Sequence, residues 1–176
     1  MSFQGIDLTQ PDAARDKALR RKIESLREGS AYRAPLSSPH CGDWTPPGLV
    51  TVRFRYPDGD VKSVKLHAKP MVLYLRVLQD SGQFCEVTVD FTSSYSGSYR
   101  SYGQQNTLYQ AYRAGTGHLA ANPCKGYHRC GRAIDLVNGI VPKVAQLMTA
   151  KTETGKRWWH GDVFGDPPHY SYGVQA

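Results

Sequence analysis

The chain lacks several features that would assign it to a well-defined class of protein. No segment approaches the roughly 20 consecutive apolar residues of a membrane-spanning helix, so we expect no membrane span. Met1 to Asp7 contain no charged stretch followed by an apolar one, and we therefore expect no secretory signal peptide. Internal repeats and known nucleic-acid-binding motifs are also missing. A chain of 176 residues is nevertheless long enough for one globular domain with its own core.

Acidic residues are in the minority, with 15 Asp and Glu against 22 Lys and Arg, which gives a net charge of +7. A charge of this sign attracts anionic polymers. Apart from Arg20-Arg21-Lys22, however, the basic residues are scattered along the chain. We therefore treat nucleic acid as an unlikely partner and keep it as a minor alternative.

Cysteine is scarce, and the four cysteines constrain the structure only weakly. Buried free thiols are one interpretation. The other is a Cys124–Cys130 disulfide that braces the intervening loop, with Cys41 and Cys85 joining the N-terminal segment to the core. A structural zinc knuckle of Cys124, His128 and Cys130 is disfavoured, because its spacing matches no common zinc pattern and no second cysteine pair follows.

The hydrophobic periodicity predicts helices and strands in mixed order without a strand–helix–strand rhythm, which favours an α+β fold with an antiparallel sheet and flanking helices. The predicted helices cover 12–28, 71–78, 104–113 and 140–148, and the predicted strands cover 50–56, 61–66, 84–91 and 133–137. A proline-rich stretch over 30–48 separates the first helix from the rest. We therefore expect an N-terminal extension over 1–48 and a main domain over 49–176. The first helix is either a surface helix or a docking helix for a partner protein.

Two short segments carry the residues best suited to chemistry. One contains His128 and Asp135, and the other reads Asp166-Pro167-Pro168-His169. A catalytic zinc ion takes three protein ligands and keeps a fourth position for water. Another group must accept the proton of that water. His128, Asp135 and His169 suit the first role and Asp166 suits the second.

The spacing within each segment is compatible with this assignment. His128 and Asp135 would lie on opposite faces of an uninterrupted strand, so the backbone must bend between them. Gly131 lies in this interval and can adopt the positive φ that a bend requires. The two prolines favour an extended conformation with about three residues per turn, which places Asp166 and His169 on the same side. Each histidine taken alone is more typical of a surface residue, and Asp-Pro-Pro-His of a solvated turn.

Three motifs in order resemble one family. The pattern His-x-x-Gly-x-Ala-x-Asp, beginning at His128, resembles that of the VanY-type D-alanyl-D-alanine carboxypeptidases, which are zinc peptidases. The segment Tyr99–Gln105, followed by Leu108-Tyr109, resembles the arginine-containing motif of the same family. Trp158–Tyr170 is similar to the ending of the L-alanyl-D-glutamate endopeptidase branch. The resemblance covers approximately residues 66–173.

This resemblance implies a single-domain fold like that of the hedgehog and D-Ala-D-Ala metallopeptidases. It implies one catalytic zinc ion held by His128, Asp135 and His169, with Asp166 as the general base. Arg100 would hold the substrate and stabilise the developing oxyanion, which suits a permanently charged guanidinium. Two groups of residues complete the expected site: Gln105 and Tyr102 at the substrate, and His160 and Asp162 as residues that orient or replace a ligand.

The implied function is hydrolysis of an amide bond in the stem peptide or cross-link of bacterial peptidoglycan. Both carboxypeptidase and endopeptidase activity remain open. A bacteriophage enzyme of this kind acts as an endolysin, reaching the wall by holin-type lysis, or travels on the virion. Its partners would be peptidoglycan, anionic wall polymers and other virion proteins. The main alternative is a non-catalytic virion or wall-binding protein that retains the fold.

Overall fold

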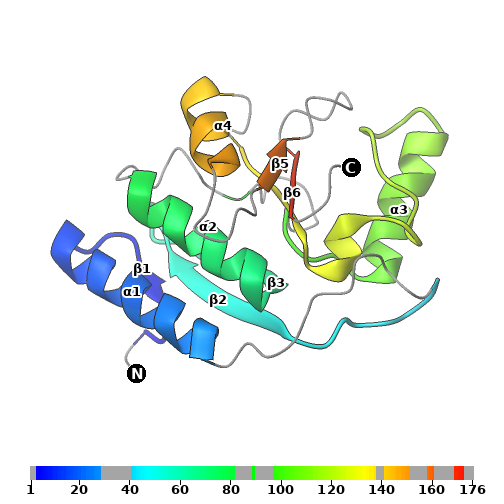
Figure 1. Ribbon diagram of the computed structural model, residues 1–176. Helices are drawn as coiled ribbons and strands as arrows, with labels where there is room; N and C mark the ends of the chain where they lie inside the picture. Colours follow the sequence, from blue (N-terminus) through cyan, green and yellow to red (C-terminus); the bar gives the residue numbers. More distant parts are fainter. Residues whose placement is uncertain are drawn as a thin grey trace.

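The computed structural model describes residues 3–28, 41–81, 89, 97–137, 141–150, 158–160 and 169–172. In this part of the chain the strands form two three-stranded sheets, with the orders β1-β2-β3 and β4-β6-β5. Figure 1 shows α1 and α2 beside the first sheet, α4 beside the second, and α3 on the side of the molecule opposite α1.

The first sheet is built on a hairpin. Strand β2 (Leu49–Arg55) pairs antiparallel with β3 (Val61–His67) along its whole length. The tight turn between them includes Gly59, whose φ of 88° favours glycine. The hairpin confirms the prediction for 50–66. Strand β1 (Ile6–Asp7), which the sequence patterns did not reveal, pairs parallel with β2. This sheet is therefore mixed, whereas the prediction was an antiparallel sheet.

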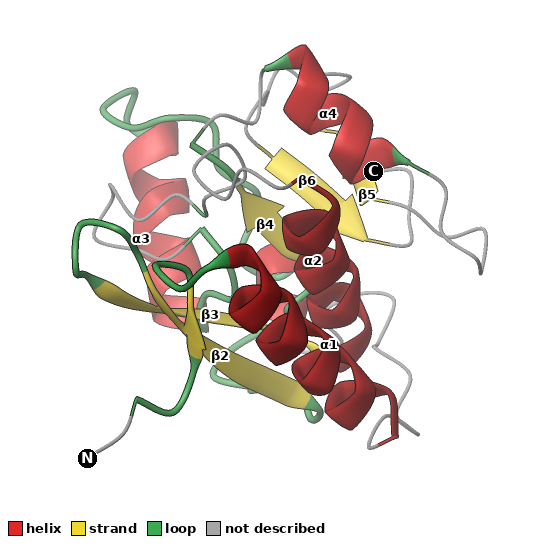
Figure 2. Ribbon diagram, turned by 90° about the vertical axis from the view of Figure 1, so that its left-hand side faces the viewer, coloured by secondary structure: helices red, strands yellow, loops and turns green. Residues whose placement is uncertain are grey.

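Two long helices lie on the same side of the first sheet (Figure 2). Helix α1 (Asp12–Glu28) has the predicted bounds, and α2 (Ala68–Ser81) extends beyond the predicted 71–78 at both ends. The buried side chains of both helices share one hydrophobic cluster with the inward face of the sheet: Leu19, Ile23, Leu26, Met71, Leu75, Leu78, Val52, Phe54, Val64 and Leu66. Helix α1 is therefore part of the core. The division of the chain at residue 48 stays a prediction.

The second sheet extends the same core. Strands β4 (Ala133–Asp135) and β5 (Trp158–His160) both pair antiparallel with β6 (His169–Tyr172). Helix α4 (Pro142–Thr149) adds Val144 and Met148 to the hydrophobic cluster. The predicted strand over 133–137 is confirmed as far as 135, and Leu136 forms an isolated bridge with Val89. The rest of the predicted strand over 84–91 lies outside the described residues.

Helix α3 (Tyr102–Arg113) begins two residues before the predicted start because its first turn is capped. The Ser101 hydroxyl accepts from the Gln104 backbone N–H, and the Gln104 side chain accepts from the Ser101 backbone N–H. A short 3₁₀ helix, η2 (Tyr127–Cys130), follows later in the chain. The overall class is α+β with one core, as predicted; the hedgehog-like peptidase fold stays a prediction.

The cysteine pairings suggested by spacing are wrong. Cys41 forms a disulfide with Cys124, while Cys130 is free and buried. Cys85 lies outside the described part of the chain. The Cys41–Cys124 pair also excludes the zinc knuckle, because a disulfide sulfur no longer offers the thiolate that zinc requires.

A buried arginine reinforces the attachment that the disulfide makes. Arg129, whose side chain is fully buried, donates to the backbone carbonyls of Gly42 at 2.6 Å, Trp44 at 3.3 Å and Pro123 at 3.3 Å. Hydrogen bonds to a charged group are stronger than neutral ones. The disulfide and Arg129 therefore both fasten the segment around residue 42 to the loop that leads into η2.

Helix α1 offers a direct test of its place in the core. The Leu19→Ala variant should lower the free energy of unfolding by about 2–5 kcal/mol, because a fully buried side chain is replaced by a cavity. Lys17→Ala, at an exposed position of the same helix, should change it by no more than about 0.5 kcal/mol. Urea unfolding measures both. Equal stabilities would show that α1 is not part of the cooperative core.

The disulfide offers a second test. Replacing both Cys41 and Cys124 by serine should lower the free energy of unfolding by about 4 kcal/mol, since the cystine closes a long loop in the unfolded chain. The two residues are 83 apart in sequence. Thermal melting with and without a thiol reductant provides the control: reductant should destabilise the wild type and leave the double variant unchanged. A wild type insensitive to reductant would contradict the pairing.

Candidate metal centre

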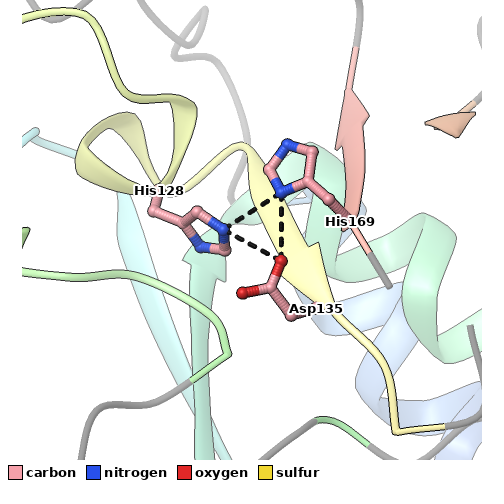
Figure 3. Close-up of side chains that lie close together, drawn as sticks. All are labelled: His128, Asp135 and His169. Atoms are coloured by element: carbon pink, nitrogen blue, oxygen red, sulfur yellow. Dashed lines mark hydrogen bonds and ion pairs between the residues drawn. The ribbon is translucent and has the colours of Figure 1, made fainter. Parts of the chain in front are cut away.

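The three predicted ligands converge although they come from separate elements (Figure 3). Asp135 ends β4 and His169 begins β6, and the two residues are directly opposed in the antiparallel register. Opposed residues project to the same face of a sheet, with their Cβ atoms about 4.5–5.5 Å apart. His128 approaches from η2. The sheet register therefore sets one pair of ligands, and the turn into the sheet sets the third.

Gly131 makes that turn possible. It follows η2 with φ 61° and ψ 33°, the left-handed conformation that favours glycine. A Cβ at this position would collide with the Leu49 side chain and would lie 2.9 Å from the backbone nitrogen of His67. The bend expected between His128 and Asp135 is confirmed. It consists of a 3₁₀ turn that ends in this glycine.

The distances between the ligand atoms suit a single small cation. His128 Nε2 lies 3.2 Å from Asp135 Oδ1 and 3.2 Å from His169 Nδ1, and His169 Nδ1 lies 3.0 Å from Asp135 Oδ1. Metal–ligand bonds of about 2.0–2.1 Å place neighbouring ligand atoms about 2.9 Å apart in an octahedral arrangement and about 3.3 Å apart in a tetrahedral one. The observed triangle falls between these values. The three residues therefore fit a metal ion.

The hydrogen bonding of His128 directs a lone pair into this triangle. Its Nδ1 lies 2.6 Å from the backbone carbonyl oxygen of Ser98. A carbonyl only accepts, so Nδ1 carries the hydrogen and donates it. In the neutral ring, Nε2 then offers its lone pair to a metal. A metal-binding histidine usually donates its other ring N–H in this way, to a carbonyl or a carboxylate. Burial, followed by the charge of Arg100, lowers the pKa of His128 to about 4, so the ring is neutral at physiological pH.

Asp135 is ionised in this setting. Burial alone would raise its pKa, but the two imidazoles and the guanidinium of Arg100 outweigh that effect and hold the pKa well below its usual value. The two carboxylate oxygens have different partners, because Oδ1 faces the imidazoles while Oδ2 forms an ion pair with Arg100. The site therefore presents one anionic oxygen and one imidazole lone pair to the same point.

Two such electron-rich atoms 3.2 Å apart repel each other unless a positive group or a hydrogen lies between them. A hydrogen on His169 Nδ1 can meet this need, since it can be donated to Asp135 Oδ1. A bound metal would take the place of that hydrogen, which in a neutral ring would then be carried by Nε2 of His169.

The other residues predicted at the site are distributed unevenly. Arg100 contacts Asp135 and also approaches Gln105, while the ring of Tyr102 lies 5.3 Å from the guanidinium of Arg129. The His160 backbone pairs with Tyr170 in β5, and its side chain is outside the described part of the structure. Asp162 and Asp166 also lie outside the described residues. The role of Asp166 as a base therefore stays a prediction.

Sequence patterns missed the carbonyl of Ser98. This group orients His128, but it belongs to the backbone and carries no side-chain signature. The neighbouring Gly97 carbonyl is a second such contact, because it accepts from the backbone N–H of Asp135 at 2.6 Å. The chain around residues 97–98 thus supports two of the three ligands, although the sequence motif that begins at Tyr99 pointed only to its side chains.

Comparison with known proteins adds no family to this description. No family model, no curated protein and no solved structure matches the chain. None of the helices in the described ranges is long and apolar enough to cross a membrane.

The metal centre predicts a defined binding behaviour. The wild type should bind one equivalent of Zn²⁺, and Asp135→Asn, which leaves the size of the side chain unchanged, should bind it much more weakly because the anionic ligand is lost. His118→Gln, at an exposed position outside the group of three ligands, is the matched control and should bind like the wild type. Isothermal titration calorimetry measures both the affinity and the stoichiometry. Equal binding by Asp135→Asn would exclude this site.

Proposed function

We propose that the protein is a zinc-dependent peptidase that hydrolyses an amide bond in the stem peptide or cross-link of bacterial peptidoglycan. The observation that carries the proposal is the triangle of two imidazole nitrogens and one carboxylate oxygen described above. Catalytic zinc sites use three protein ligands, whereas structural sites are closed by four. Within the described residues, no fourth histidine, cysteine or acidic residue joins the group.

The donor set alone does not select zinc, since two histidines and one carboxylate also bind non-haem iron. The sequence motifs favour zinc, because all three resemble segments of one zinc peptidase family. When bound, a zinc ion supplies Lewis acidity that lowers the pKa of water to about 7. Measurement of the metal content of purified protein separates the two metals.

The exposure of the ligands indicates where a substrate approaches. The His128 side chain is 6% exposed, whereas those of Asp135 and His169 are 15% and 17% exposed. The imidazole of His128 is thus the most buried of the three side chains. We expect a peptide to reach the centre from the side of β4 and β6, whose ligands are more exposed.

The remaining role is that of the base. Asp166 stands three residues before His169, at the position that the family resemblance assigns to the general base. In the proposed reaction its carboxylate takes a proton from the attacking water and gives it to the departing amine. This proton transfer leaves Asp166 ionised again at the end of the cycle.

The wall is also the expected partner on electrostatic grounds. The net charge of +7 favours association with anionic wall polymers. Near the site, the ammonium of Lys65 lies 5.0 Å from the ring of Tyr99, the residue next to Arg100. A cation and an aromatic ring together suit a substrate that combines sugars, peptide and acidic groups. The protein would act on the wall as an endolysin or as part of a virion.

The decisive experiment is mass spectrometry of the fragments released from purified peptidoglycan by the zinc-loaded protein, with and without a chelator. We expect chelator-sensitive release of defined stem peptides, whose masses distinguish carboxypeptidase from endopeptidase activity. Asp166→Ala should release them about 10²–10⁴-fold more slowly while still binding zinc, because only proton transfer is removed. Asp80→Ala, at an exposed position of α2, is the control and should match the wild type.

Failure of the zinc-loaded wild type to release fragments from several wall types would contradict the proposal. It would favour a non-catalytic wall-binding or virion protein, particularly if the protein co-sediments with the same walls. Sedimentation with nucleic acid that weakens steeply with added salt would instead favour the nucleic-acid alternative.

A further inference from the structure

The segment of residues 97–100 runs between the first sheet and the metal centre. On one side, the backbone N–H of Tyr99 donates to the Lys65 carbonyl at 2.9 Å, and the Ser98 hydroxyl accepts from the Lys65 backbone at 3.1 Å. On the other side, the segment contacts the metal ligands through both its backbone and its side chains. The segment therefore holds the metal ligands in a fixed position relative to β3.

Four contacts connect this segment to two of the ligands. The carbonyls of Gly97 and Ser98 accept from the Asp135 backbone and from the His128 ring, as described above. The backbone N–H of Arg100 donates to the His128 carbonyl at 3.3 Å, and its side chain forms the ion pair with Asp135 Oδ2. Arg100 thus contacts both ligands, His128 through its backbone and Asp135 through its side chain.

The guanidinium of Arg100 is itself oriented by the side chain of Gln105. Its Nη1 lies 3.5 Å from Oε1 of Gln105, a residue that is only 1% exposed. The Gln105 Nε2 donates to the carbonyl of Ala121 at 2.9 Å. Gln105 comes from the first turns of α3, so the helix, Arg100 and Asp135 form one chain of contacts. Its side chain therefore joins Arg100 to the backbone of Ala121; its predicted contact with the substrate stays a prediction.

We infer that Arg100 is a positioning residue that keeps Asp135 bound to the metal through Oδ1 alone, and that it acts through this carboxylate and not on the substrate. The inference rests on the proposed metal site. A carboxylate whose two oxygens are equivalent can rotate about its broad terminal torsion or bind a metal through both oxygens. A guanidinium on Oδ2 prevents both.

The ion pair between Arg100 and Asp135 is buried enough to restrain the carboxylate. The side chains of Arg100 and Asp135 are 12% and 15% exposed, well below the exposure at which ion pairs contribute little. Arginine keeps its charge under all conditions of interest, unlike histidine. Loss of a comparable outer contact typically weakens metal binding by about 10–100-fold.

The test compares Arg100→Ala, Arg100→Lys and the control Arg113→Ala, which removes an exposed arginine from the last turn of α3. Zn²⁺ affinity is measured by competition with a chromogenic chelator, and coordination by the visible spectrum of the Co²⁺-loaded protein. Arg100→Ala should lose about 10–100-fold in affinity and show weaker Co²⁺ bands, because a second carboxylate oxygen enters the coordination sphere. Arg100→Lys should recover part of the affinity, and Arg113→Ala should match the wild type.

The possible outcomes separate this inference from the proposed function. If the wild type binds metal and Arg100→Ala retains its affinity and Co²⁺ spectrum, the inference is overturned while the zinc peptidase stands. A variant in which only KM is raised would show that Arg100 binds the substrate. A wild type that binds no metal overturns both. If near-ultraviolet circular dichroism shows that Arg100→Ala is unfolded, Gln105→Leu decides: weaker metal binding supports the inference, and unchanged binding overturns it.

Discussion

An ionised carboxylate cannot remain in a protein interior without partners, because removing a charge from water costs several kcal/mol. Asp135 meets this condition with the guanidinium of Arg100 on one oxygen and with Nδ1 of His169, which can donate a hydrogen, near the other. Three separate parts of the chain build the site around it. Strand β6 brings His169, the turn at Gly131 brings His128, and the segment before α3 brings Arg100. The same charge that demands these partners also makes the site attractive to a metal cation.

The rigidity of the centre comes from outside the ligands. His128 lies in a four-residue 3₁₀ helix, which has little stability of its own. The disulfide between Cys41 and Cys124 and the buried guanidinium of Arg129 hold the loop that leads into this helix. Asp135 and His169 are instead held by sheet pairing. The three ligands thus depend on two different kinds of support. One is a disulfide together with hydrogen bonds from a buried guanidinium to backbone carbonyls, and the other is a regular hydrogen-bonded ladder.

Local patterns predicted much of this protein. Strict alternation identified the β2–β3 hairpin, because a half-buried sheet forces a period of two. Helical spacing identified α1 with its observed bounds, and the glycine between two potential ligands indicated the bend that Gly131 makes. The three ligands themselves were predicted from residue type and spacing. Each of these features was predicted from a short stretch of chain, where side-chain periodicity and backbone preference act directly.

The sequence by itself therefore determined the helices, the hairpin, the glycine turn and the identity of the residues able to bind a metal. Only the tertiary structure decided that Cys41 pairs with Cys124, that β1 joins the sheet in parallel, and that Arg100 contacts Asp135. The backbone carbonyl of Ser98 was equally hidden. These contacts join residues far apart in the chain, and their formation depends on how the whole core packs. Residue type and spacing carry no record of that packing.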